Sequence, residues 1–381
     1  MIPYGKQHIT EEDIAEVTKT LKSDFLTQGP KINEFEKKFA EYVDAKYAVA
    51  VANGTAALHL SALALNVNEK SNVITTPITF AASANCIRYC GGEVAFADID
   101  PATALIDIEK IKQLLVSSPK ETFQGIIPVD LAGYPVNLET LRELADEYNL
   151  WIIEDACHAP GGYFTDSKGT KQKCGNGVYA DLSIFSFHPV KHITTGEGGM
   201  ITTNNKNLYE KLLMLRTHGI TKNPELMHEN HGGWYYEMQM LGYNYRLPDM
   251  NAALGISQLK RADENLKKRI AIAKKYDEAF LNKNIQLIKP PACIKHAYHL
   301  YVIQINNRKN LYDHLKKYQI FSQVHYIPVY MQPYYKELGF KAECFPNANA
   351  YYEKCLSLPM YPTLTEKEQN FVIETLLSFV Q

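Results

Sequence analysis

The chain has 381 residues, of which 46 % are hydrophobic and 22 % are charged. These shares are close to the average of globular proteins, so they exclude a disordered or fibrous chain. Lys and Arg total 40 against 42 Asp and Glu, and the resulting net charge of −2 gives no broad attraction for nucleic acid or for an anionic membrane. The seven cysteines form no CxxC pair, which favours reduced thiols and no structural zinc or other metal site.

The sequence shows no signal for export or for membrane insertion. Its most apolar stretch, residues 56–67, is interrupted by His59 and Ser61 and is shorter than the roughly 20 residues that a membrane helix needs. The opening MIPYGKQHITEED has no basic segment followed by an apolar one, as a secretory signal would have. We therefore expect a cytoplasmic protein without a membrane partner.

Short apolar runs alternate with helical patterns between residues 30 and 215. The predicted strands cover residues 47–52, 72–76, 93–97, 125–129, 150–154, 181–187 and 200–203. The predicted helices between them cover residues 56–64, 108–116, 138–148 and 207–216. The strands are almost continuously apolar, which is typical of a mostly parallel sheet with both faces buried. The pattern thus predicts an α/β fold.

The pattern changes after residue 250. One long helical pattern comes first, and shorter elements follow it: a helix over 250–282, a strand over 299–305, and helices over 311–317 and 366–380. We expect two domains, a large one over residues 21–249 and a small α+β one over 250–381. The N-terminal arm, residues 1–20, is assigned to the small domain and contains a helix opened by Thr10-Glu-Glu-Asp, a capping-box pattern.

In a sheet of this kind, ligands bind beyond the carboxyl ends of the strands. Asn53-Gly54-Thr55 follows the first predicted strand and opens a helix. Glycine admits a close approach of the backbone, and the free N–H groups of a helix start favour an anion such as phosphate. An ordinary strand–turn–helix with Thr55 as its cap is the alternative. Neither a GxGxxG motif after a strand nor a P-loop motif is present.

An acidic pair, Glu154-Asp155, ends another buried strand. Burial of a carboxylate is costly unless something pairs with it, so one member of the pair is expected to point into a site. An Asp there can hold a metal, orient a histidine or keep a pyridine nitrogen protonated, and a salt-bridged surface turn is the alternative. His158, three residues on, is either a ligand contact or a hydrogen-bonded turn histidine.

Lys191 lies in an apolar stretch rich in glycine and hydroxyl groups, residues 183–200. Desolvation lowers the pKa of a lysine and makes its amine nucleophilic, as Schiff-base chemistry requires, although most lysines are solvated surface groups. A phosphate-binding turn, an acid and a buried amine together fit pyridoxal phosphate. Phe80, just past the second strand, is placed to cover the ring of that cofactor, with a core phenylalanine as the alternative.

Longer motifs point to a known family. They are LTQGPKINEFEKKFAEY (26–42), ANGTAALHL (52–60), TTPITFAASAN (75–85), IIEDACHAPGG (152–162), SIFSFHPVKHITTGEGGM (183–200) and LGYNYRLPDMNAALG (241–255). Nearly end to end, the chain resembles the DegT/DnrJ/EryC1/StrS family of pyridoxal-phosphate-dependent nucleotide-sugar aminotransferases. This resemblance implies the type I (aspartate aminotransferase) fold, with a mostly parallel central sheet flanked by helices.

Residue roles follow from the resemblance by matching position. It implies that Lys191 forms the Schiff base, that Asp155 holds the pyridine nitrogen and that His158 contacts the ring hydroxyl. The remaining implied cofactor contacts are the phosphate ligands Gly54, Thr55 and Ser186, the stacking ring of Phe80, and Asn244, which reaches the phosphate of the neighbouring subunit. The family's active sites lie between subunits, so the resemblance also implies a homodimer with shared sites.

The resemblance also bears on the substrate. His188, three residues before the lysine, resembles the members that aminate C4 of the sugar, whereas those that aminate C3 tend to have Tyr there. TTPITFAA, SFHPVK and QVHYIPVY resemble the branch of pseudaminic acid biosynthesis, which implies L-glutamate, with 2-oxoglutarate as its product, and a UDP-linked 4-keto-6-deoxy-2-acetamido sugar. The implied substrate contacts are Tyr4, Phe25, Leu26, Thr27, His188, Gln323, His325 and Tyr326.

Several alternatives stay open at this point. They are a sister C4 aminotransferase of the perosamine or bacillosamine type, a dehydratase dependent on the same cofactor, and a non-enzymatic regulatory protein. The lysine favours transamination, because the dehydratases of the family carry His in its place. The sequence leaves open the effect of His192, where relatives usually have Pro or Asn, and the role of the polar insert over residues 165–176. It also leaves open the stereochemistry of the sugar.

Overall fold

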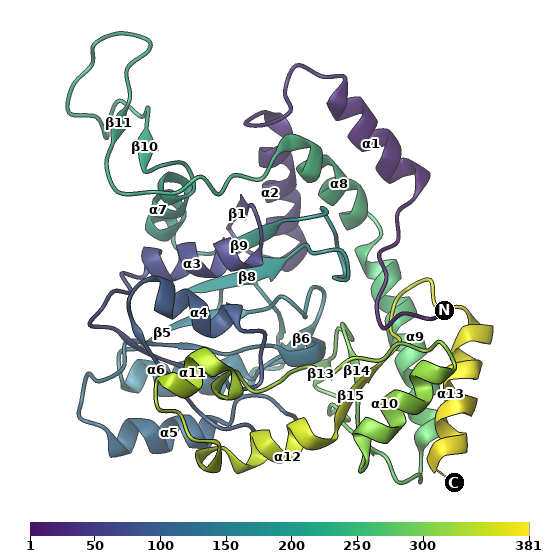
Figure 1. Cartoon of the computed structure of the whole chain (residues 1–381). Helices are drawn as coiled ribbons and strands as arrows, with labels where there is room; N and C mark the ends of the chain where they lie inside the picture. The colour runs from purple at the N-terminus through teal and green to yellow at the C-terminus, as the bar shows by residue number, and fades with distance from the viewer. Residues whose placement is uncertain (381) are drawn as a thin grey trace.

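The computed structural model describes residues 1–380 and is built around a seven-stranded sheet (Figure 1). The strands are β1 (Tyr47–Val51), β2 (Asn72–Thr75), β3 (Glu93–Phe96), β4 (Gly125–Ile127), β5 (Trp151–Asp155), β8 (Leu182–Ser186) and β9 (Gly199–Thr203). Their order is β1-β9-β8-β5-β4-β2-β3. Strand β9 is antiparallel to both of its neighbours, and the other pairs are parallel. The predicted strands and the mostly parallel α/β sheet are confirmed.

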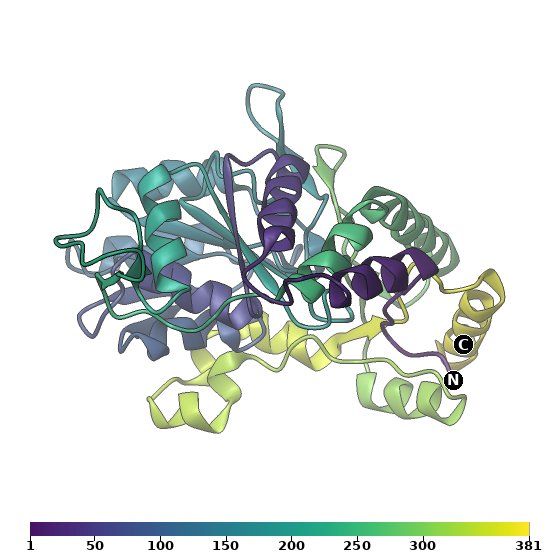
Figure 2. The ribbon, with the colours of Figure 1, turned by 90° about the horizontal axis from the view of Figure 1, so that it is seen from above.

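Helices cover both faces of this sheet (Figures 1 and 2). They are α2 (Pro30–Val43), α3 (Gly54–Ala64), α4 (Ala82–Tyr89), α5 (Ile108–Ser117), α6 (Leu138–Glu147) and α7 (Lys206–Leu215). Helix α3 lies against β1, β8 and β9, while α2 lies against β1. In β1, Val49 and Val51 join one buried cluster, and Ala48 and Ala50 join another. Both faces of the strand are therefore buried, which explains why it has no polar side.

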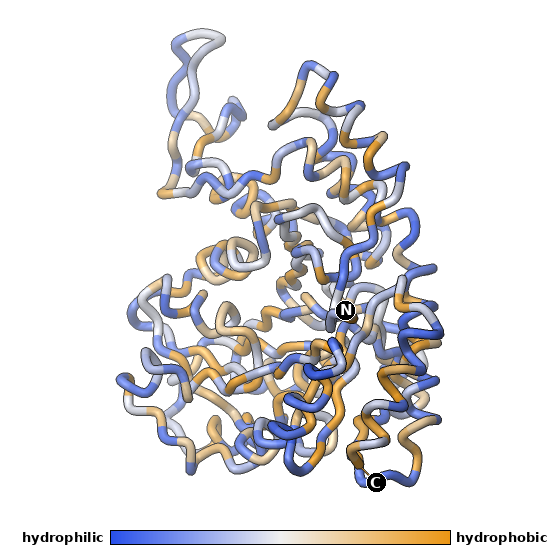
Figure 3. The backbone as a smooth tube through the Cα atoms, turned by 45° about the vertical axis from the view of Figure 1, so that its right-hand side comes forward, coloured by the Kyte–Doolittle hydropathy of each residue, from blue (hydrophilic) through white to orange (hydrophobic). Residues whose placement is uncertain are grey.

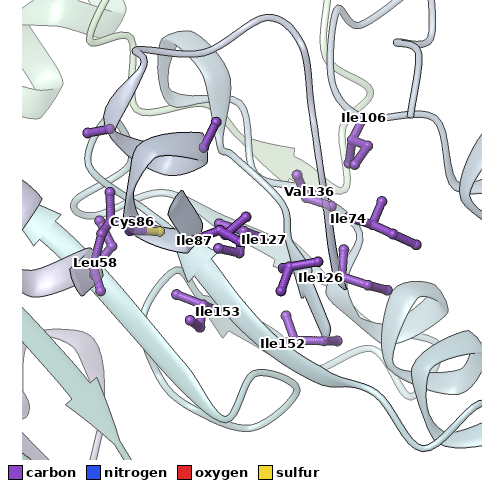
Figure 4. Packing of buried hydrophobic residues seen from close by; sticks show 14 of the residues in the cluster. Leu58, Ile74, Cys86, Ile87, Ile106, Ile126, Ile127, Val136, Ile152 and Ile153 are labelled. Atoms are coloured by element: carbon purple, nitrogen blue, oxygen red, sulfur yellow. The ribbon is translucent and has the colours of Figure 1, made fainter. Parts of the chain in front are cut away.

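Isoleucines dominate the core between the central strands and the helices above them (Figure 4). The side chains of Ile74, Ile126 and Ile153 are fully buried, and they pack in one cluster with Leu58 of α3 and Ile87 of α4. Burial of one such side chain stabilises a fold by about 1.5–3 kcal/mol. This core fixes the relative positions of β2, β4 and β5, and so of the loops that follow them.

The long helix predicted over 250–282 is wrong as a single element. The structure has two helices there, α8 (Asp249–Leu259) and α9 (Ala262–Phe280), which are separated by Lys260 and Arg261. The guanidinium of Arg261 binds the carboxylate of Asp13, on α1 (Glu11–Leu21), and the carbonyl oxygen of His8. Helix α1 packs along α8, so a contact far away in sequence accompanies the break.

A second core lies in the C-terminal part of the chain. It is formed by α9, α10 (Arg308–Lys317), α13 (Glu366–Val380), β14 (Tyr301–Gln304), β15 (Cys355–Leu358) and the N-terminal Ile2. Strand β14 pairs with β15 and with β12 (Gln286–Leu287), and Ile2 pairs with Ile320. Hydrophobic and hydrophilic stretches alternate along these helices, as expected for helices with one buried face (Figure 3). The division of the chain into domains at residue 250 stays a prediction.

The remaining elements are short. They are β6 (Tyr163–Thr165), β7 (Lys171–Lys173), β10 (Ile220–Thr221), β11 (Glu237–Met238), β13 (Ile294–Lys295), α11 (Pro333–Glu337), α12 (Pro346–Lys354) and the 3-10 turns Leu131–Gly133, Val329–Met331 and Ala342–Cys344. The polar insert forms the β6–β7 hairpin. Strands β10 and β11 belong to an arm that projects from the molecule, at the upper left of Figure 1. Within residues 1–380, every helix is too short or too polar to cross a bilayer.

Candidate active site

A cavity of about 770 Å³ opens where β1, β2, β5 and β8 end. Its walls come from the loops after these strands, from the segment around residues 323–332 and from the N-terminal arm. The residues predicted for a site that line it are Tyr4, Gly54, Thr55, Phe80, Asp155, His158, Ser186, His188, Lys191, Gln323, His325 and Tyr326. The structure thus brings together residues from distant parts of the chain, while their individual roles stay predictions.

One wall is the first turn of α3. The side chain of Asn53 caps this helix by accepting a hydrogen bond from the N–H of Ala56 at 2.8 Å. A Cβ atom on residue 54 would lie 3.0 Å from Cβ of Ser186, so glycine is what allows α3 and the end of β8 to approach so closely. The unpaired N–H groups at such a helix start, together with the helix dipole, favour an anion. This turn fits a phosphate group.

The acidic pair at the end of β5 divides between the two faces of the sheet. Asp155 lines the cavity, where Oδ2 accepts a hydrogen bond from Oγ of Ser83 at 2.7 Å and Oδ1 accepts one from the N–H of Cys157 at 3.2 Å. Glu154 accepts bonds from the Ser183 hydroxyl and from the N–H of Gly175 instead. Burial raises the pKa of Glu154, whose hydrogen-bond partners lie outside the cavity. The sequence interpretation that one member of the pair faces a site agrees with this arrangement.

Ser83 was not among the predicted site residues. It lies in the first turn of α4, where its hydroxyl is 2.9 Å from Oγ1 of Thr79 as well as bonded to Asp155. The two hydroxyl residues four positions apart after β2 were the only local signal. Other residues that line the cavity and were not predicted include Cys157, Glu197, His299 and Gln332.

His158 is held on three sides. Its Nδ1 accepts a hydrogen bond from the N–H of Ala132 at 3.2 Å, its Nε2 lies 3.2 Å from the hydroxyl oxygen of Tyr326, and its ring centroid lies 4.3 Å from that of His299. Burial lowers the pKa of His158 well below the usual value, and the nearby Lys191 charge lowers it further. The imidazole is therefore neutral at physiological pH.

Lys191 follows β8 in a tight turn, in which its N–H donates to the carbonyl oxygen of His188 at 2.9 Å. Burial lowers the pKa of its amine, while the carboxylate of Asp155 acts in the opposite direction. A lower pKa increases the neutral fraction of the amine, which is the form that attacks a carbonyl group. The side chain therefore has the properties that Schiff-base chemistry needs.

His192, whose effect the sequence left open, is buried behind the lysine. Its Nε2 lies 2.7 Å from the carbonyl oxygen of Ala297, and its ring centroid is 5.8 Å from that of His299. Burial lowers its pKa well below the usual value. His192 does not line the cavity, so its position argues against direct contact with a substrate.

Aromatic rings form the opposite wall. Phe80 is 63 % exposed, which argues against a core phenylalanine, and its ring centroid lies 6.2 Å from that of Tyr326. The ring of Tyr4 lies 5.3 Å from the ring of His325, whose Nδ1 is 2.8 Å from the Ser357 hydroxyl. Phe80 is thus free to stack on a planar ligand between itself and the residues of β5.

Four predicted residues lie away from this cavity. Phe25, Leu26 and Thr27 are exposed in the loop before α2, where the carbonyl oxygen of Leu26 accepts a hydrogen bond from the N–H of Asp249. Asn244 is exposed and forms a bridge with Thr217 at the base of the β10–β11 arm. The structure therefore does not bring these residues to the cavity of their own chain.

The cavity as a whole fits pyridoxal phosphate. The α3 turn suits its phosphate, Asp155 is an anchored carboxylate for its ring nitrogen, Lys191 supplies the amine, and Phe80 offers a ring face.

Residues 7–377 match the model of the DegT/DnrJ/EryC1/StrS aminotransferase family. The chain belongs to this family. It is 40 % identical to the UDP-4-amino-4,6-dideoxy-N-acetyl-beta-L-altrosamine transaminase of Campylobacter jejuni, and the match covers 100 % of this chain and 98 % of that protein. Matches to similar relatives cover 97–98 % of their lengths. The enzyme is therefore an aminotransferase dependent on pyridoxal phosphate.

Solved structures agree with this assignment. Helicobacter pylori PseC, described as an aminotransferase involved in the biosynthesis of pseudoaminic acid, matches with a TM-score of 0.90 and 30 % identity, covering 100 % of this chain and 99 % of its own. The putative sugar aminotransferase Spr1654 of Streptococcus pneumoniae, in its PLP-form, matches with a TM-score of 0.88 and 30 % identity, covering 99 % and 98 %. The type I aminotransferase fold expected from the sequence is confirmed.

Proposed function

We propose that this aminotransferase moves the amino group of L-glutamate to C4 of a UDP-linked 4-keto-6-deoxy-2-acetamido sugar, as in pseudaminic acid biosynthesis. The observation that carries the proposal is the 40 % identity, over the whole chain, with the transaminase that is named for such a product. The position of His188 supports it, because this residue lines the cavity three residues before Lys191. The resemblance associates a histidine there with amination at C4.

The residues of the chain have separate tasks in this reaction. Bound pyridoxal phosphate would supply an aldehyde carbon that takes the amino nitrogen from the donor, with loss of water, and a ring that accepts electrons. Nζ of Lys191 would move a proton from the α-carbon of the donor to the former aldehyde carbon of the cofactor. In the second half of the cycle it would move a proton from that carbon to C4 of the sugar. Asp155, fixed by the hydroxyl of Ser83, keeps a proton on the ring nitrogen. Proton transfer by a positioned side chain is worth about 10²–10⁴-fold in rate.

We also propose that the enzyme works as a homodimer with shared active sites. Asn244 is exposed and lies outside the cavity of its own chain, which supports the implied role at the phosphate of a neighbouring subunit. The same holds for Phe25, Leu26 and Thr27, which are exposed and do not line the cavity of their own chain. Their proposed contacts with the sugar nucleotide would then be made across the subunit interface.

The test is an incubation of the pure enzyme with glutamate and a panel of nucleotide-linked 4-keto sugars, followed by NMR of the products. The panel contains stereoisomers at C5 and substrates of the perosamine and bacillosamine types. We expect an amino group at C4 of the UDP-linked 2-acetamido sugar, with 2-oxoglutarate as co-product. Preference for another sugar contradicts the proposed substrate, and a deoxygenated product formed without glutamate contradicts transamination.

Two lysine variants make the same assay a test of the site. Lys191→Ala is expected to lose at least about 10⁴-fold in rate, because proton transfer and the covalent anchor are lost together. Lys173→Ala is the matched control, since this lysine lies on β7, where it pairs with Asp44 at 2.9 Å. Turnover that survives in Lys191→Ala would refute the assignment of this lysine.

A further inference from the structure

Both ring nitrogens of His158 are engaged within the chain. Nδ1 lies 3.2 Å from the backbone nitrogen of Ala132, and Nε2 lies 3.2 Å from the hydroxyl oxygen of Tyr326. The family resemblance gives His158 a contact with the ring hydroxyl of the cofactor and gives Tyr326 a contact with the substrate. The structure instead links these two side chains to each other.

The direction of each hydrogen bond follows from the backbone partner. A backbone N–H can only donate, so Nδ1 of His158 carries no proton and accepts from Ala132. A neutral imidazole then carries its proton on Nε2, which donates to the oxygen of Tyr326. Burial keeps the pKa of His158 far below the usual value, so the ring does not gain a second proton at neutral pH.

The hydroxyl of Tyr326 is left with one proton to donate. Its oxygen already accepts from His158, and burial raises the pKa of Tyr326, so the group stays protonated. Tyr326 lines the cavity, and the titratable groups near it are Asp155, Cys157, Tyr4, His325 and Tyr351, besides His158. From the cavity wall, this hydroxyl can donate a hydrogen bond to an acceptor oxygen of a bound ligand.

We propose that Tyr326 is a positioning residue. Its oxygen is fixed by His158, and its hydroxyl donates a hydrogen bond to the phenolic oxygen of bound pyridoxal phosphate. His158 then acts through Tyr326 rather than as the sole partner of that oxygen. The ring of His299, 4.3 Å away, packs against His158 and helps to hold the pair in place. This assignment goes beyond the proposed substrate, because it concerns the enzyme before any sugar binds.

Loss of this donor has a measurable consequence. A hydrogen bond to the phenolic oxygen lowers its negative charge, and that charge favours protonation of the Lys191 nitrogen joined to the cofactor. Without the donor, the nitrogen therefore holds its proton to higher pH. The visible absorption of the bound cofactor reports this proton, and no sugar or amino donor is needed to measure it.

The experiment is a pH titration of the absorption of the holoenzyme and of its Tyr326→Phe variant. We expect the midpoint of this titration, the pH at which half of the Lys191 nitrogens joined to the cofactor have lost their proton, to rise by about one pH unit in Tyr326→Phe. Tyr330→Phe is the matched control, because Tyr330 follows in the same segment and donates to Oδ1 of Asn349 at 2.7 Å without lining the cavity. Its midpoint is expected to stay at the wild-type value.

A second measurement addresses the bond to His158 directly. In holoenzyme labelled with ¹⁵N-histidine, the Nε2 proton of His158 should exchange with solvent faster in Tyr326→Phe than in the wild type or in Tyr330→Phe. An unchanged midpoint in Tyr326→Phe, with only the KM for the sugar raised, would overturn the proposal and leave Tyr326 as a substrate contact. Since the titration uses no sugar, failure here is distinguishable from failure of the proposed substrate.

Discussion

At the scale of single residues, the site depends on partners that hold its charged groups. Asp155 has one oxygen on the Ser83 hydroxyl and the other on the N–H of Cys157. A hydrogen bond to a charged group contributes about 1.5–3 kcal/mol, more than one between neutral groups. Ser83 therefore helps to hold the carboxylate in one orientation, although it need not touch the reacting atoms.

The variant Ser83→Ala tests this contribution. Loss of the donor leaves one oxygen of a buried carboxylate without its partner, so we expect kcat to fall by about tenfold or more and the cofactor to bind more weakly. Steady-state kinetics and titration with pyridoxal phosphate measure the two effects. Ser167→Ala removes an exposed hydroxyl that bonds to Glu139 and serves as the control. A wild-type kcat in Ser83→Ala would show that Asp155 does not depend on this bond.

At the scale of elements, the local pattern of the sequence was enough to locate most strands and helices. The alternation of apolar strands and amphipathic helices is a local property, and so are the motifs after β1, β5 and β8. What the pattern could not show depends on distant contacts. Arg261 binds Asp13 from 248 residues away at the break between α8 and α9, and Ser83 binds Asp155 from 72 residues away.

The loop before α2 is another element that a distant residue holds. Asp249, fully buried at the start of α8, accepts hydrogen bonds from the N–H groups of Gly29 at 2.7 Å and Lys31 at 2.8 Å. These are free N–H groups at the N-terminus of α2, where a carboxylate is favoured. Asp249 thus fixes the start of α2 and, through it, the position of residues 25–27.

We expect Asp249→Ala to lower the free energy of unfolding by about 3–6 kcal/mol, because two charge-assisted hydrogen bonds of about 1.5–3 kcal/mol each are lost. Asp249→Asn should lose less, since its amide oxygen still accepts a bond. Denaturant unfolding measures both, and Asp263→Asn, at the exposed first turn of α9, is the control. If residues 25–27 contact the sugar nucleotide, the KM for the sugar rises in the same order. Equal stability of all three variants would contradict this role of Asp249.

At the scale of the whole molecule, buried histidines link stability to pH. Burial lowers the pKa of five histidines in and around the cavity, and for two of them, His296 and His325, the pKa falls to about 3. The five are His158, His192, His296, His299 and His325. In the unfolded chain a histidine titrates near pH 6.5, so below that pH the unfolded state binds more protons. Stability therefore falls as the pH drops below about 6.5.

Each such histidine contributes a slope of at most about 1.4 kcal/mol per pH unit. The buried carboxyls of Asp130 and Glu154 act in the opposite direction, because burial raises their pKa values and the folded state retains a proton there. We expect the thermal midpoint to decrease steadily from pH 6.5 to pH 5. His296→Asn should make this decrease less steep, because about one proton fewer is taken up on unfolding. His231→Asn, on the exposed arm, should leave the pH dependence unchanged. A flat profile in the wild type would contradict the argument.

The shared site proposed for the dimer can be tested by mixing two inactive variants. Lys191→Ala and Asn244→Ala are each expected to have little activity alone. If Asn244 serves the neighbouring subunit, a mixed dimer has one site with both defects and one site with Lys191 and Asn244 intact. Random exchange of subunits makes about half of the dimers mixed, so roughly a quarter of all sites regain activity. If Asn244 instead serves its own chain, every site in the mixture lacks one of the two residues. No recovery is then expected after exchange, and recovery to about a quarter of the wild-type rate is the outcome that the exposed position of Asn244 predicts.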